Sequence, residues 1–133
     1  MPALWSDDGA DSILQRAECP AGLPRSTVRR GGRYAACVRE RPGAGDGGGA
    51  VPESLAEQGR LIWRNIEAQL AEVGMSLDNV VKATTFLSDR KYAIENRAIR
   101  NEIMGAREPA ITVIICGLFD EKWLLEIEVV AAA

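Results

Sequence analysis

Hydrophobic residues recur with a helical period over residues 52–74 of this chain. Five of them lie at successive spacings of seven, four, four and three residues, and these are Leu55, Ile62, Ile66, Leu70 and Val73. Such spacings place side chains on one face of a helix. Ser54 suits the N-cap of this helix, and Gly74 suits a left-handed stop after it. The pattern therefore predicts an amphipathic helix between these two residues.

Three later segments are rich in β-branched residues and predict strands. They cover residues 80–87, 111–116 and 123–130. Between the first two, Asp89 can cap a second helix that ends at Gly105. The inward stripe of this helix has spacings of four, three and four residues and consists of Tyr92, Asn96, Ile99 and Ile103. Residues 27–38 are able to add an N-terminal strand or hairpin.

From residue 51 onward the predicted order is helix, strand, helix, strand, strand. This order favours an α+β fold in which two helices pack on one face of a mixed sheet. The other face of such a sheet stays uncovered in a single chain. We therefore expect a second copy of the chain to cover it, which predicts a homo-oligomer.

The composition narrows the class of protein. The chain has 133 residues, of which 47% are hydrophobic, and a formal net charge of −3. This suits one folded domain and does not favour nucleic-acid binding. No apolar run approaches the roughly 20 residues of a membrane span, and the first 11 residues include no basic residue, unlike a signal peptide. We expect a cytoplasmic protein that does not bind membranes.

The residue types present also limit the chemistry. The chain has no histidine, which excludes Ser-His-Asp and Cys-His catalysis and most zinc sites. Its three cysteines are scattered without a C-x-x-C motif and are expected to be reduced thiols. We predict no metal and no other cofactor.

Residues 1–50 differ in character from residues 51–133. Residues 25–41 hold six arginines against one acid, Glu40, and a glycine-rich run follows. The arginines would suit a basic arm for anions or RNA, but acids elsewhere in the segment nearly cancel them. A partly solvated segment is the favoured interpretation. We treat residues 1–50 as an atypical N-terminal segment of the same domain and residues 51–133 as its core.

A few polar residues interrupt the apolar pattern. Asn96 lies on the inward stripe of the second helix, where an unpaired buried amide costs about 1–3 kcal/mol. Glu126 and Glu128 share one face of the last strand because strand side chains alternate. A solvated face is the simpler interpretation, but a carboxylate in a partly dry cleft can exchange protons with water. Cys116 ends a strand and is more typical of a small buried thiol than of a nucleophile.

Three stretches of the sequence and one asparagine resemble the Rid/YjgF family of reactive intermediate deaminases, part of which carries the label endoribonuclease L-PSP. They are NIEAQLAEVGMSLDNVVKATTFLSD, then Asn96, then EPAITV, then LLEIEVVA. The resemblance implies a chorismate-mutase-like homotrimer with the sheets inside, the helices outside and the sites in clefts between subunits. It also implies hydrolysis of small enamines or imines, such as 2-aminoacrylate, to a keto acid and ammonia.

The resemblance assigns site residues by matching motifs. The catalytic, water-handling glutamate matches Glu126, the first acid of E-I-E, and the family's helix asparagine matches Asn96. The family's carboxylate-binding arginine, in the motif P-A-R-S/T, is replaced by Ile111. The substrate-binding positions that we predict are Asn96, Ile111, Thr112, Val113 and Cys116, with the backbone amide groups of Thr112 and Val113 available whatever their side chains.

Ile111 leaves three functions open. A deaminase of a small enamine or imine, with weak activity toward 2-imino acids, ranks first. A small-molecule-binding or protein-stabilising trimer without turnover ranks close behind. A ribonuclease ranks last, because no general acid–base pair is evident.

The N-terminal motifs of the family are also missing. Residues 25–47 have therefore diverged or are translated from an altered reading frame, and the coding DNA decides between these two explanations.

Overall fold

Five strands form one mixed sheet with the order β1-β2-β5-β3-β4. This is a computed structural model that describes residues 25–30, 33–40, 42–43 and 50–133; most of residues 25–40 are described by their backbone alone. The strands are β1 (Arg25–Arg30), β2 (Arg33–Glu40), β3 (Val80–Leu87), β4 (Ala110–Ile115) and β5 (Leu125–Ala132). The helices are α1 (Leu55–Glu72) and α2 (Ala93–Met104), with short 3-10 turns η1 (Leu77–Asn79) and η2 (Arg90–Tyr92).

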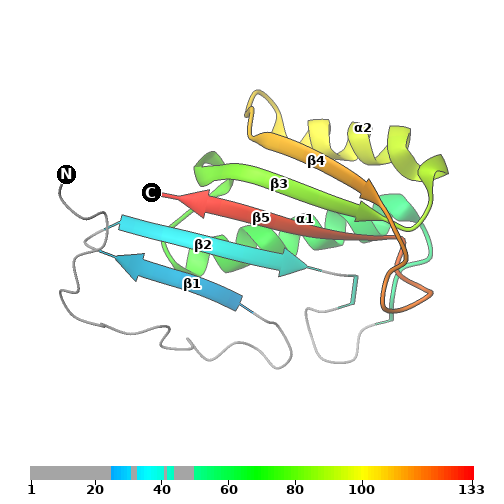
Figure 1. The fold of residues 1–133 in the computed structure, drawn as a ribbon, viewed down its shortest axis with the longest axis horizontal. Helices are drawn as coiled ribbons and strands as arrows, with labels where there is room; N and C mark the ends of the chain where they lie inside the picture. Colours follow the sequence, from blue (N-terminus) through cyan, green and yellow to red (C-terminus); the bar gives the residue numbers. More distant parts are fainter. Residues whose placement is uncertain (1–24, 31–32, 41, 44–49) are drawn as a thin grey trace.

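The chain crosses between parallel strands only once in the described sheet. β3 and β4 are parallel and are connected through α2, whereas the other neighbouring pairs are antiparallel. Both helices lie on the same side of the sheet (Figure 1). The predicted α+β fold, with two helices on one face of a mixed sheet, is therefore confirmed.

The first helix forms where its capping residues and apolar stripe predict it. The Ser54 hydroxyl accepts a hydrogen bond from the Glu57 backbone N–H at 3.2 Å, which satisfies one of the free donors of the first turn. Gly74 follows the helix with a φ of 72°, a conformation that glycine adopts without a steric penalty. Leu55, Ile62, Ile66 and Leu70 are buried against the sheet. Asp89 caps η2, which leads directly into α2.

The core lies between α1 and the middle of the sheet. Alternate residues of β5 are buried there, and these are Leu125, Ile127, Val129 and Ala131. The intervening residues, including Glu126 and Glu128, are half-buried on the opposite face. The predicted common face of the two glutamates is therefore confirmed. That face carries no helix among the described residues.

Two strand boundaries differ from the sequence prediction. β4 begins and ends one residue earlier than residues 111–116. β5 begins two residues after residue 123, because the Trp123 backbone N–H closes a turn on the Asp120 carbonyl at 3.0 Å. It continues to Ala132 because β2 pairs with its end, where Ala35 lies opposite Ala132. Of the two N-terminal alternatives, a strand or a hairpin, the structure shows the hairpin, as the antiparallel pair β1–β2.

Candidate functional site

The two β5 glutamates have different neighbours on the open face of the sheet. Glu126 pairs in register with Phe86 of β3, which in turn pairs with Ile114 of β4. Glu128 pairs with Thr84 of β3 and, on its other side, with Arg39 of β2. Paired residues share a face. The β3 and β4 positions in the row of Glu126 are therefore apolar, whereas the described neighbours of Glu128 are polar.

The predicted substrate-binding strand β4 is exposed along its whole length. Its register with β3 places Ile111, Val113 and Ile115 on the helix side of the sheet. Thr112 lies on the other face and pairs with Thr84. Cys116 follows β4, is half-buried, and its backbone N–H donates to the Leu87 carbonyl at 2.9 Å.

Glu126 and Ile111 do not form one site within a single chain. Ile111 pairs with Ala83, whose β5 partner is the buried Val129, so it lies on the face opposite Glu126. Their Cα positions are also far apart. They are separated by two strand spacings of about 4.8 Å across the sheet and by three residue steps of about 3.3 Å along the strands, and these perpendicular displacements combine to about 14 Å. A substrate of a few carbon atoms cannot contact both.

Asn96 also lies on the helix side, away from Glu126. Its side chain is 3% exposed and faces the core from α2, as the stripe predicted. Its Nδ2 atom has no hydrogen-bond partner among the residues that the structure describes. The buried position is confirmed, and the substrate-binding role stays a prediction.

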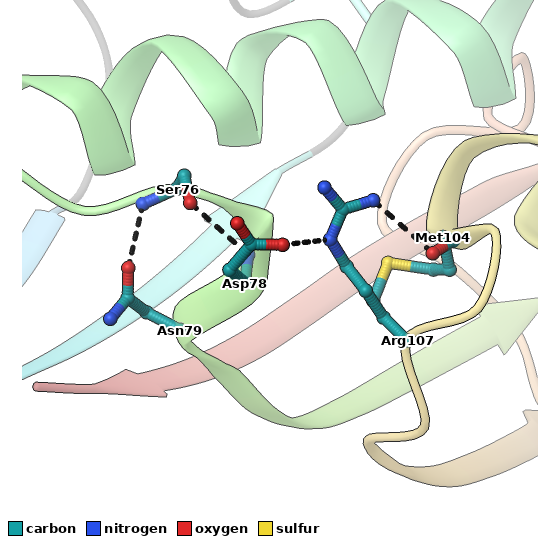
Figure 2. Close-up of polar contacts among 5 residues, drawn as sticks. All are labelled: Ser76, Asp78, Asn79, Met104 and Arg107. Carbon is teal, nitrogen blue, oxygen red and sulfur yellow. Dashed lines mark hydrogen bonds and ion pairs between the residues drawn. The ribbon is translucent and has the colours of Figure 1, made fainter.

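A polar network that the sequence analysis missed sets the start of β4. The Arg107 Nε atom donates to the Asp78 carboxylate at 2.6 Å, and its Nη1 atom donates to the Met104 carbonyl at 3.2 Å. Asp78 is held in η1, which begins with a capping box between Ser76 and Asn79 (Figure 2). The network ties the turn before β3 to the connection between α2 and β4. Arg107 lies four residues before Ile111, so it helps to place this strand.

A second missed residue fixes the loop before β5. The side chain of Gln58 is fully buried in α1. Its Nε2 atom donates to the carbonyls of Pro52 at 2.7 Å and Lys122 at 2.9 Å, and its Oε1 atom accepts from the Leu124 backbone N–H at 2.8 Å. A lone glutamine in a helical stripe gives no sequence signal for this role, because its partners are backbone groups 6 to 66 residues away.

A groove of about 510 Å³ runs between the outer surfaces of α1 and α2 and contains none of the predicted site residues. Trp63 and Ile103 form part of its floor, and Arg60 forms a two-point ion pair with Glu102 beside them. The hydrogen bond and charge of Arg60 lower the pKa of the Glu102 carboxyl, and Glu102 in turn raises the pKa of Arg60.

Within the described ranges, no three His, Cys, Asp or Glu side chains gather as a set of metal ligands. No helix in the same part of the chain is both long enough and apolar enough to cross a membrane.

Comparison with known proteins places this arrangement in a family. The sequence model for "Endoribonuclease L-PSP" matches residues 40–133. The chain belongs to this family. A RutC family protein of Pyrococcus abyssi is 28% identical over 119 residues, which cover 90% of this chain and 93% of that protein.

Solved structures of related proteins agree with this assignment. A Yersinia pestis protein of the Rid family, YyfA, superposes with a TM-score of 0.74 at 26% identity, over 92% of this chain and 98% of that chain. Yeast Mmf1 superposes with a TM-score of 0.71 at 26% identity, over 84% and 89%. The chain is therefore a member of the L-PSP family, which includes the RutC, YjgF and Rid proteins.

Proposed function

We propose that this L-PSP family member is a hydrolytic deaminase of a small enamine or imine, with Glu126 as the group that handles water. The observation that carries the proposal is the half-buried position of Glu126 on the open face of the sheet, beside Phe86 of β3, which in turn lies beside Ile114 of β4. A half-buried carboxylate on an open sheet face can reach both water and a small substrate, as proton transfer between them requires.

The reaction needs one water molecule and one proton carrier. Glu126 accepts a proton from water as the water oxygen attacks the imine carbon. It passes that proton to the nitrogen, which gives a carbinolamine. Glu126 then accepts the proton of the carbinolamine hydroxyl as the carbonyl forms and passes it to the amino group, so that the C–N bond breaks and ammonia leaves. Each turnover restores the carboxylate, and no group other than water is consumed.

A homotrimer completes the site in this proposal. Glu126 and Ile111 lie on opposite faces of one chain, so they can line the same cleft only if they come from two copies. The exposed strand β4 and the open face of the sheet are the surfaces that a second and a third copy would contact. Light scattering at micromolar concentration should give three times the 14.4 kDa of one chain. A mass of 14.4 kDa would contradict this assembly.

The test of the catalytic role compares two neighbouring carboxylates. Glu126→Gln keeps the size of the side chain but removes the proton acceptor, so it should abolish imine hydrolysis in a semicarbazide-trapping assay. Glu128→Gln is the matched control and should retain most of the activity. Equal losses from the two variants, or a dissociated assembly in Glu126→Gln alone, would show that Glu126 has a structural role instead.

We expect the partner of this site to be a small metabolite. A cytoplasmic location and the lack of nucleic-acid binding remain predictions from the composition. A trimer that binds a small molecule without turnover is the alternative. It is favoured by the isoleucine at position 111, which cannot provide the charged contact of the family's arginine.

A further inference from the structure

The helix-side surface of β4 is an uninterrupted apolar stripe. Ile111, Val113 and Ile115 are 38%, 40% and 41% exposed. They are spaced two residues apart, so the stripe is about 13 Å long from the first to the last Cα. Their partners on β3 are buried, so the stripe lies at the edge of the core and continues its apolar surface outward.

Cationic side chains are missing from this strand and from the two residues that follow it. The nearest preceding cation is Arg107, and its guanidinium is already paired with Asp78 and with the Met104 carbonyl. A carboxylate placed against Ile111 would lose water without gaining a charged or side-chain donor from β4 itself or from Ala83, the residue in register with Ile111 on β3. Burying an ionised group without a partner is strongly unfavourable.

We propose that the substrate of this site carries no carboxylate and that its hydrocarbon group lies along the Ile111–Val113–Ile115 stripe. The class is a neutral imine with a short aliphatic chain, of the kind that oxidation of a primary amine supplies. This inference rests on the proposed deaminase function. The reaction is R–CH=NH plus water giving R–CH=O plus ammonia, with Glu126 of another copy carrying the proton.

A matched pair of imines tests the substrate class. An amine oxidase acting on 3-methylbutylamine and an amino-acid oxidase acting on leucine generate imines that share one branched hydrocarbon group and differ by the carboxylate. Semicarbazide trapping then reports how fast this protein removes each imine. We expect the neutral imine to be hydrolysed at least about tenfold more efficiently, a preference of about 1.4 kcal/mol. Equal rates, or a faster rate with the leucine-derived imine, would overturn the proposal.

Two variants with the same added charge localise the effect. Ile111→Arg supplies a cation in the stripe and should reverse the preference toward the carboxylate-bearing imine. Ile94→Arg adds the same charge at a residue of α2 that is 84% exposed and does not belong to the stripe, and it should leave the preference unchanged. A reversal in both variants would mean that net charge, and not the stripe, selects the substrate.

A binding measurement separates this inference from the proposed function. The isoleucine methyl resonances of the labelled protein are followed during titration with 3-methylbutanamide and with 3-methylbutanoate. The amide should shift the Ile111 methyl signals at a concentration at least about tenfold lower than the carboxylate does, without shifting those of Ile94. Binding of the amide without any imine hydrolysis would refute the deaminase function and leave the ligand class intact. Tighter binding of the carboxylate, or no shift with either compound, would overturn the ligand class itself.

Discussion

Gln58 and Gln69 permit a test of how buried amides contribute to the stability of this chain. Both side chains lie in α1 and are almost fully buried, at 0% and 3% exposure. Gln58 makes three hydrogen bonds to backbone groups of two loops. Neither amide atom of Gln69 has a partner among the described residues. The same substitution at the two positions should therefore have opposite effects.

The magnitude follows from the hydrogen bonds that each change removes. Gln58→Met preserves the length of the side chain but leaves the Pro52 and Lys122 carbonyls and the Leu124 N–H without their partner. At about 1 kcal/mol for each net hydrogen bond, the free energy of unfolding should fall by about 3 kcal/mol. For a chain of this length, that corresponds to a decrease of about 10 °C in the melting temperature.

Gln69→Met is the matched control on the same helix. Burial of an amide without partners costs about 1–3 kcal/mol, so replacing it with an apolar side chain should leave the melting temperature unchanged or raise it. Calorimetry and urea unfolding should be run at one fixed protein concentration, because association would also shift the midpoint. Similar losses of stability in the two variants would refute the reasoning.

Three further changes test other parts of the fold. Gly59→Ala should raise the melting temperature by up to a few degrees, because alanine favours a helix over glycine by about 1 kcal/mol and the added Cβ would lie no closer than 3.4 Å to Ile99. Gly59→Leu should lower the melting temperature, because the larger side chain would crowd α2. Glu102→Gln should reduce the free energy of unfolding slightly at pH 7, because it removes the ion pair with Arg60. The pKa of Glu102 is lowered in the folded state, so the difference in stability between the variant and the original chain should disappear as the pH falls through that pKa. High salt should also reduce this difference. Asp78→Asn should increase the hydrogen-exchange rate of β4 amides and leave those of α1 unchanged, because Asp78 holds Arg107 beside the start of that strand.

The elements of the core were predictable because their signals are local. The stripe from Leu55 to Leu70 defines a helix whatever surrounds it, and Ser54 and Gly74 limit it through their own backbone preferences. The alternation around Ile127 likewise separates the two glutamates from the core. The end of β5 was not predictable from its alanines, which are weak strand formers, because it depends on pairing with β2.

The residues that join distant segments gave no such signal. Gln58 bonds to the loop before β5, and Arg107 bonds to η1, which precedes β3. Gly59 allows α1 to approach Ile99 of α2, but a single glycine within a helix does not identify the segment that packs against it. Each role depends on which loop or helix lies opposite, and that information is absent from the periodicity of any one segment.

The arrangement of the candidate site follows from the same distinction between local and long-range information. Period-two alternation assigns Glu126 and Glu128 to one face of β5, yet it cannot relate that face to the one that Ile111 occupies on β4. The register through β3 makes this relation, and it places Ile111 on the opposite face and about 14 Å away along the sheet. Two residues that a motif assigns to one small site are therefore incompatible with a site in one chain. If both contribute to the same cleft, the interface between copies is part of the active site, and dilution to monomers should abolish activity without unfolding the chain.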